Sequence, residues 1–268
     1  MRSIHEDDMN PGFMDFLKSR GVLDHPGLSG HVPRYMHSLR HMPHGAFLRG
    51  GDYSRALEIG TNFIFPELLM NHMGFEAVDV TQFNPNSTEK KRTIPLPRDP
   101  EKRTVTSFNV DLEYEPIPAD DGTYDLVLCF EVIEHMEIDP MYLIENINRV
   151  LRPDGLCFLS TPNSASARNV HKILRGYAPH FFMKYGKART YHRHNFEYAP
   201  HQLVDLMKSA GFTIRKLWTC DTLEGSIPGI VDFLAENGFV TNHRGDNLFV
   251  IGQKTGPVVD RYPSSIYS

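Results

Sequence analysis

The stretch Tyr124–Phe130, YDLVLCF, decides the fold, and Glu131–Met136, EVIEHM, follows it directly. A continuous apolar run of this length is typical of a strand buried on both faces, and such strands occur mainly in parallel sheets covered by helices. In those sheets, ligands bind just beyond the carboxyl ends of the strands. We therefore expect Glu131, Glu134 and His135 to lie at a functional edge of the sheet.

The composition is that of one folded α/β domain. The chain has 268 residues, of which 40% are hydrophobic and 23% charged, and a formal net charge of −5. Its first residues, Met1–Asp8, become acidic where a signal peptide would be apolar, and no apolar run approaches the roughly 20 residues that cross a bilayer. We expect a cytoplasmic protein without a membrane span. Two of the three cysteines, Cys129 and Cys157, lie in apolar runs, which favours buried thiols over a disulfide or metal ligands.

Strand and helix patterns alternate along the chain. The sequence predicts strands over 56–59, 77–80, 105–110, 125–130, 156–160, 213–219 and 247–252, and helices over 65–73, 141–151 and 200–210. Gly155 and Gly211 follow the last two helices, where glycine favours termination. Alternation of this kind predicts a doubly wound, mostly parallel sheet with helices on both faces.

Five segments in this order resemble the class I S-adenosylmethionine-dependent methyltransferases: ALEIG (56–60), AVDV (77–80), YDLVLCFEVIEHM (124–136), NINRVLRPDGLCFLSTPN (146–163) and HNFEYAPHQLVDLMKSAGF (194–212). The resemblance covers roughly residues 34 to 253. It implies a Rossmann-like, seven-stranded sheet whose last strand is antiparallel. It also implies a methyltransferase domain over 34–255 with a helical substrate-recognition insertion over 163–196, a cap segment over 1–33 and a tail over 256–268.

The resemblance also implies the cofactor site. Around the turn after the first strand it assigns Glu58, Gly60, Thr61 and Asn62, where Asn62 replaces the family's second glycine; because Asn tolerates positive φ, the turn is expected to survive. At the end of the second strand, Asp79 and the adjacent Val80 would hold the ribose, unless Asp79 is only a strand-end acid facing water. Asp111 and Leu112 would flank the adenine, unless Asp111 is only a turn acid. Phe130 and Glu131 would lie beside the transferable methyl group, and the charge of the cap suggests that Arg34, Tyr35 and Arg40 reach the cofactor carboxylate.

His135 is the candidate general base, because its unperturbed pKa is about 6.5 and it follows the fourth strand. The alternative is that His135 only caps or packs against the next helix. A third possibility resembles the small-RNA 3′-terminal 2′-O-methyltransferases, in which Glu131, Glu134, His135 and His194 would hold Mg²⁺ or Mn²⁺. Ubiquinone-type O-methyltransferases are similar around the same residues, so the pattern does not by itself indicate RNA.

The insertion is the main evidence about the acceptor. It carries seven basic and no acidic residues, so the rest of the chain carries about −12 by difference from −5. Its aromatic residues suit an anionic, ring-bearing acceptor, although a solvated basic hairpin is the simpler interpretation. A second basic stretch, over 90–103, is expected to be a mobile loop because of its prolines and polar residues.

Three functions remain open from the sequence. The first is O-methylation of a sugar, nucleotide-linked sugar, glycan end or similar polar small molecule, which the negative net charge favours. The second is RNA 2′-O-methylation. The net negative charge of the chain outside the insertion disfavours it, because binding the phosphates of an RNA strand requires a broad positive surface. The third is a non-catalytic binding protein, suggested by the altered glycine turn.

Overall fold

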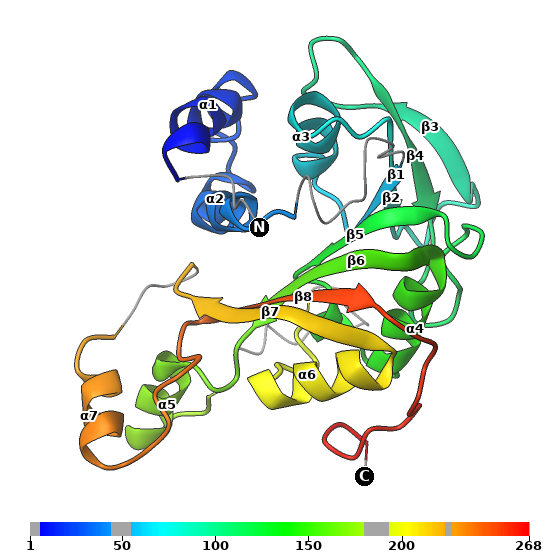
Figure 1. Cartoon of the computed structure of the whole chain (residues 1–268). Coiled ribbons are helices and arrows are strands. Elements are labelled where there is room, and N and C mark those ends of the chain that lie inside the picture. Colours follow the sequence, from blue (N-terminus) through cyan, green and yellow to red (C-terminus); the bar gives the residue numbers. More distant parts are fainter. Residues whose placement is uncertain (1–5, 44–54, 180–192, 223–226, 268) are drawn as a thin grey trace.

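The computed structural model describes residues 6–43, 55–179, 193–222 and 227–267. In this part the strands form one eight-stranded sheet in the order β3-β4-β2-β1-β5-β6-β8-β7 (Figure 1). The strands are β1 Arg55–Ile59, β2 Ala77–Gln82, β3 Lys91–Pro95, β4 Thr104–Asn109, β5 Tyr124–Phe130, β6 Leu151–Pro162, β7 Phe212–Cys220 and β8 Asn247–Lys254. The helices are α1 Glu6–Ser19, η1 Ser29–His31, α2 Val32–Arg40, α3 Phe65–His72, η3 Ile133–His135, α4 Pro140–Val150, α5 Ala167–Leu174, α6 Pro200–Ser209 and α7 Ile230–Glu236.

The expected mostly parallel sheet is confirmed, including an antiparallel last strand. β4, β2, β1, β5 and β6 pair in parallel, while β8 runs antiparallel to both β6 and β7. The eighth strand is β3, which pairs antiparallel with β4 at the sheet edge. It contains Lys91 and Arg92, so the expectation of a mobile loop over 90–103 is wrong for this part of the stretch.

The central strand β5 separates two layers of core. Leu126, Leu128 and Phe130 pack toward α1, α2 and α3, whereas Val127 and Cys129 pack toward α4 and α6. Figure 1 shows these helices on opposite faces of the sheet. All seven residues of β5 are buried, as the unbroken apolar run predicts. Cys129 and Cys157 are buried free thiols, which confirms the prediction for them.

The N-terminal helices lie on the face that also carries α3. The second of them, α2, is fixed to β7 through its imidazoles: Trp218 Nε1 donates to His37 Nε2 at 2.7 Å, and Lys216 Nζ lies 2.8 Å from His41 Nδ1. The Trp218 ring also stacks on Phe249 of β8, with 5.4 Å between the centroids. This attachment places α2 next to the ends of β1 and β5.

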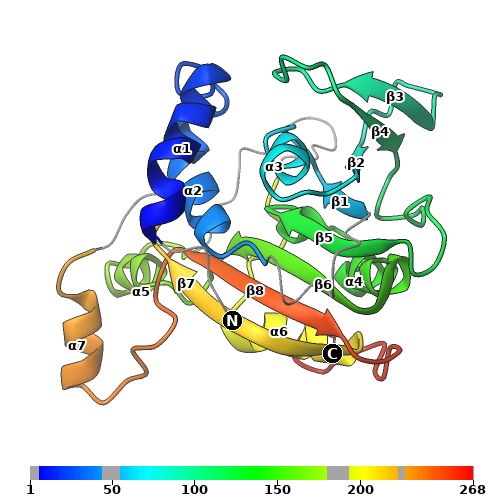
Figure 2. The same ribbon diagram turned by 45° about the horizontal axis from the view of Figure 1, so that its top comes forward.

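Two short helices, α5 and α7, project together beyond the end of the sheet, as Figure 2 shows. The first begins the predicted insertion, but His180, Phe181, Phe182, Lys184, Tyr185, Lys187, Arg189 and Tyr191 of that insertion lie outside the described residues. In the described ranges, no helix is both long and apolar enough to cross a membrane. The division into cap, domain and tail stays a prediction.

Candidate functional site

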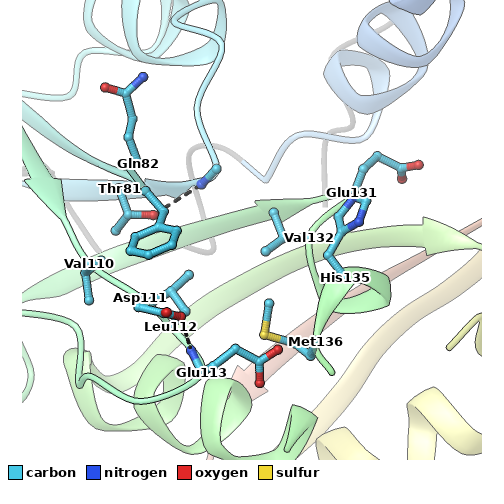
Figure 3. Close-up of a pocket in the computed structure, with 12 residues that line it drawn as sticks. Thr81, Gln82, Val110, Asp111, Leu112, Glu113, Glu131, Val132, His135 and Met136 are labelled. Atoms are coloured by element: carbon cyan, nitrogen blue, oxygen red, sulfur yellow. Dashed lines mark hydrogen bonds between the residues drawn. The ribbon is translucent and has the colours of Figure 1, made fainter. Parts of the chain in front are cut away.

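A cavity of about 320 Å³ lies where β1, β2, β4 and β5 end (Figure 3). Ligands bind at this edge in open α/β sheets. The lining comes from the turn after β1, the end of β2 and the segments after β4 and β5: Gly60, Thr81, Gln82, Phe83, Val110, Asp111, Leu112, Glu113, Glu131, Val132, His135 and Met136. Five residues predicted from the sequence, Gly60, Asp111, Leu112, Glu131 and His135, therefore surround one space.

A second cavity, of about 140 Å³, adjoins the first because both are lined by Gly60 and Glu131. Helix α2 forms one wall with Arg34, Tyr35 and Ser38, and the remaining walls contain Glu58, Asn62, Phe65 and Phe130. Arg34 Nε and Ser38 Oγ are buried there without a hydrogen-bond partner among the described residues. Arg40 lines neither cavity.

The turn after β1 brings the backbone close to both cavities at Gly60. This residue has φ +71°, and a Cβ placed on it would lie 2.6 Å from Val132 Cγ2. Its N–H donates to Thr81 Oγ1 at 3.2 Å, which ties the turn to β2. Glycine is therefore required at Gly60 by conformation and by space.

The rest of the turn is held by side chains where the family has glycines. Asn62 Oδ1 accepts from the N–H of Ile64 at 3.3 Å, and Asn62 Nδ2 donates to the Tyr35 hydroxyl at 2.6 Å. The positive φ falls at Phe63, with φ 67°, and not at Asn62, so the tolerance of Asn for positive φ is not what maintains the turn. A bulky residue in this conformation is unusual and marks a strained backbone at the site.

Charges converge on the smaller cavity. Burial raises the pKa of Glu58 to about 7, although a hydrogen bond from the Thr61 hydroxyl and the nearby Arg34 charge favour its ionised form. Burial also lowers the pKa of Arg34, whose Nη1 lies 3.5 Å from Glu131 Oε1. This end of the site thus offers a cation and two carboxylates within a small enclosed space.

The sequence predicts that Asp79 lies at the end of its strand, but the structure places it inside the strand. It is the third residue of β2 and is 3% exposed, and its Oδ2 accepts from Arg55 Nη2 at 2.6 Å and from the Tyr124 hydroxyl at 2.8 Å. Neither Asp79 nor the fully buried Val80 lines either of these two cavities. The end of β2 presents Thr81 and Gln82 to the larger cavity instead.

Glu131 is turned away from the other predicted metal ligands. Its φ is 55°, and its Oε1 accepts from the Ser160 hydroxyl at 2.7 Å and from Asn247 Nδ2 at 3.1 Å. Together with Arg34, these contacts hold the carboxylate between the two cavities. The four predicted ligands therefore reduce to three that the structure brings together.

Those three are Glu134, His135 and His194. One potential ligand atom of each lies within 4.8 Å of the other two. Neighbouring ligands of an octahedral magnesium ion are about 3 Å apart, because each lies about 2.1 Å from the ion. The three groups are thus close enough to hold one ion after a small inward shift of their side chains.

The surroundings of the cluster also suit a cation. His135 Nδ1 lies 3.0 Å from the Arg193 carbonyl, so it must carry the proton, and Nε2 lies 3.8 Å from Glu134 Oε1. His194 Nδ1 lies 3.1 Å from Glu197 Oε1. Metal-binding histidines usually donate their second N–H to a carbonyl or carboxylate in this way.

Glu134 is fully buried. Its Oε2 accepts from Thr161 Oγ1 at 3.0 Å, and its Oε1 has no hydrogen bond within the described chain. Burial raises the pKa of Glu134 to about 7, although the Thr161 hydroxyl and the Arg34 charge favour its ionised form. A buried carboxylate oxygen of this kind requires a proton or a cation.

Sequence reasoning missed several residues around the cavities. Ser38 lies one helical turn after Arg34, and an i, i+4 search from that arginine would have found it. Glu113 accepts from the N–H groups of Glu137 and Ile138, and so links the two walls formed by the segments after β4 and β5. No local pattern signals Gln82 or Glu113, because their roles depend on strand register.

Comparisons with known proteins agree with this geometry. A family model described as a methyltransferase domain matches residues 34–217. A ubiquinone biosynthesis O-methyltransferase of Neisseria meningitidis is 29% identical over 110 residues, which are 39% of this chain and 44% of that protein. The chain thus spans less than half the length of this curated relative.

Solved structures show the same fold. A chain from the complex between the Haloferax volcanii Trm112 methyltransferase activator and a methyltransferase superposes with a TM-score of 0.55 at 15% identity, over 92% of this chain and 97% of that one. A SAM-dependent methyltransferase from Archaeoglobus fulgidus gives 0.52 at 16% identity, over 91% and 100%. Together with these structures, the family match shows that the chain belongs to the methyltransferase-domain family and has the fold of class I S-adenosylmethionine-dependent methyltransferases.

Proposed function

We propose that the protein transfers a methyl group from S-adenosylmethionine to a hydroxyl of a polar, anionic acceptor, such as a sugar, a nucleotide-linked sugar or a glycan end. Glu134, His135 and His194 would hold a divalent ion, Mg²⁺ or Mn²⁺, beside the acceptor. The observation that carries the proposal is the convergence of these three side chains next to the cofactor cavity. A cytoplasmic location is part of the same proposal.

The two adjoining cavities fit the two ends of the cofactor. The larger would take the adenosine, with Asp111 and Leu112 beside the base and Gln82 near the ribose. The smaller would take the methionine, whose carboxylate needs donors such as Arg34 Nε and Ser38 Oγ, both buried without a partner in the described chain. Its ammonium group would face Glu58 and Glu131. Gly60 would then lie where the two halves of the cofactor join.

The cluster fits a divalent ion for two reasons. A cation is one of the two ways to satisfy the unpaired Oε1 of the buried Glu134, and both imidazoles have Nδ1 next to an oxygen acceptor. When bound, such an ion lowers the pKa of an acceptor hydroxyl and orients it. Two imidazoles beside one carboxylate favour Mn²⁺ over Mg²⁺.

His135 acting as a lone base is the simpler form of the same function. With its Nδ1 proton directed at Arg193, its Nε2 can take the proton of an acceptor hydroxyl. The sulfonium is already activated, so the remaining task of the protein is to hold the acceptor oxygen in line with the methyl group. Loss of activity on removal of metal would indicate the metal-assisted reaction, and unchanged activity would indicate His135 as a lone base.

RNA 2′-O-methylation is the second candidate. It is favoured by basic residues in and directly after α5 and in the segment carrying His194, namely Arg168, Lys172, Arg175 and Arg193. The negative net charge of the chain opposes it, because RNA binding depends on a broad positive surface.

Release of S-adenosylhomocysteine tests the proposal. The assay uses sugar phosphates, nucleotide sugars and a short RNA with a free 3′ end as acceptors, before and after exhaustive chelation. We expect turnover with a sugar acceptor that chelation removes and Mn²⁺ restores. Full activity after chelation would leave His135 as a lone base, and turnover with RNA alone would replace the sugar class. Failure to bind S-adenosylhomocysteine in calorimetry would instead favour a non-catalytic protein.

The cluster itself is tested by His194→Ala. His201→Ala on α6 is the matched control, because His201 is exposed and lies outside the cluster. We expect the first variant to lose Mn²⁺ binding and turnover while it keeps affinity for S-adenosylhomocysteine. Equal Mn²⁺ affinity in both variants would exclude His194 as a ligand.

A further inference from the structure

The three clustered side chains come from two irregular segments that meet outside the sheet. Glu134 and His135 belong to η3, a single 3₁₀ turn of three residues without a side-chain cap at its start. His194 belongs to the segment before α6. Short 3₁₀ turns have poor hydrogen-bond geometry, so tertiary contacts must fix the position of this one.

Asn195 supplies the contacts between the two segments. Its N–H donates to the Glu134 carbonyl at 2.7 Å, and its Nδ2 donates to the His135 carbonyl at 2.8 Å, across 60 residues of sequence. The next N–H, that of Phe196, also points to the Glu134 carbonyl, at 3.3 Å. Asn195 thus binds the backbone of two cluster residues and directly follows the third.

The same side chain also acts on the His135 ring. Asn195 Oδ1 accepts from Arg193 Nε at 2.8 Å, and the Arg193 carbonyl is the group that faces His135 Nδ1. Holding Arg193 in place therefore keeps Nδ1 as the donor and directs Nε2 toward Glu134. The side-chain amide of Asn195 therefore links the His135 backbone to Arg193, whose carbonyl holds the His135 ring.

We propose that Asn195 is the positioning residue of the cluster and sets the spacing of the Glu134, His135 and His194 ligand atoms. This inference rests on the metal-assisted function proposed above. Functional side chains must be held to within about 0.5 Å of their productive geometry, and backbone hydrogen bonds to the residues that carry them provide such control. Asn195 touches neither the cofactor cavity lining nor the clustered ligand atoms, so it acts through its neighbours.

The test measures Mn²⁺ binding by electron paramagnetic resonance in wild type, Asn195→Ala and a control, Asn148→Ala. The control also loses an amide that donates to backbone carbonyls, because Asn148 Nδ2 donates to Ala210 and Gly256, but it lies outside the cluster. We expect Asn195→Ala to weaken Mn²⁺ binding about 10- to 100-fold, as loss of groups that orient metal ligands usually does. Its kcat should fall at saturating acceptor, with the affinity for S-adenosylhomocysteine within about twofold of wild type.

The outcomes separate this inference from the proposed function. Absence of Mn²⁺ binding in wild type would overturn both. Binding in wild type with equal affinity in Asn195→Ala, or an equal loss in Asn148→Ala, would overturn only the positioning role. Asn195→Ser keeps a shorter donor and acceptor, and serves if the alanine variant does not fold. We expect it to weaken Mn²⁺ binding by less than the alanine change but outside the error of the measurement, and wild-type affinity would overturn the proposal.

Discussion

Replacing Gly60 by alanine should damage the site in two separable ways. The left-handed backbone at φ +71° costs an L-residue about 1–2 kcal/mol. The added Cβ would lie 2.6 Å from Val132 Cγ2, so the valine must leave its rotamer at a further cost of about 0.5–1.5 kcal/mol. Together we expect Gly60→Ala to lower the free energy of unfolding by about 1.5–3.5 kcal/mol.

Gly74→Ala is the matched control. Gly74 has a similar φ of +76°, but nothing lies within 4 Å of its added Cβ, so only the backbone cost of about 1–2 kcal/mol applies. The gain from restricting the unfolded chain is the same for both variants and cancels in their comparison. Urea denaturation of the two variants therefore isolates the contact with Val132.

Calorimetry with S-adenosylhomocysteine measures the effect of Gly60→Ala on binding. Gly60 lines both cavities, so a methyl group there intrudes where the two halves of the cofactor meet. We expect an affinity at least about 10-fold weaker, which corresponds to about 1.4 kcal/mol. Wild-type affinity in Gly60→Ala, or an equal loss in Gly74→Ala, would refute the placement of the cofactor.

Two predictions concern pH. Burial raises the pKa of Glu58 to about 7 from 4.5, so the folded protein binds this proton more tightly than the unfolded chain, and stability should fall as pH rises from about 4.5 to 7. Glu58→Gln should remove this loss of stability. Its melting temperature in differential scanning fluorimetry should exceed that of wild type at pH 8 but not at pH 4.5. A difference in melting temperature that is the same at both pH values would contradict the assignment. Burial lowers the pKa of His37 and of His41 to about 4, so the unfolded chain takes up these protons first and stability should fall as pH drops from about 6.5 toward 4. In the same assay His41→Gln should show a smaller drop over this interval, and an unchanged profile would show that these imidazoles do not control the docking of α2.

The elements predicted well from sequence are those whose pattern is local. The run over 124–130 is apolar on both faces, and it became the buried centre of the sheet. In contrast, four of the five residues of β3 are exposed and the fifth is only partly buried, so this edge strand has no apolar alternation and resembled a loop. Its pairing with β4 depends on backbone hydrogen bonds, which sequence patterns do not reveal.

Site residues are harder to predict from sequence when the direction of the side chain depends on a single backbone angle or on the register between two strands. Asp79 fits the strand pattern, yet its pairing with Leu57 places it inside β2, where Arg55 and Tyr124 bind it. Glu131 follows its strand as expected, but its positive φ turns the carboxylate toward Ser160 and Asn247. Spacing alone predicted which residues approach the edge, but not where each one points.

The attachment of α2 to β7 involves the only tryptophan of the chain, Trp218. Its indole touches His37 on the helix that carries Arg34 and Ser38 into the smaller cavity. Any displacement of that helix changes the polarity around the indole, because the His37 and Lys216 side chains lie against it. Intrinsic fluorescence of the unmodified protein therefore reports the position of this helix against β7, without any attached dye.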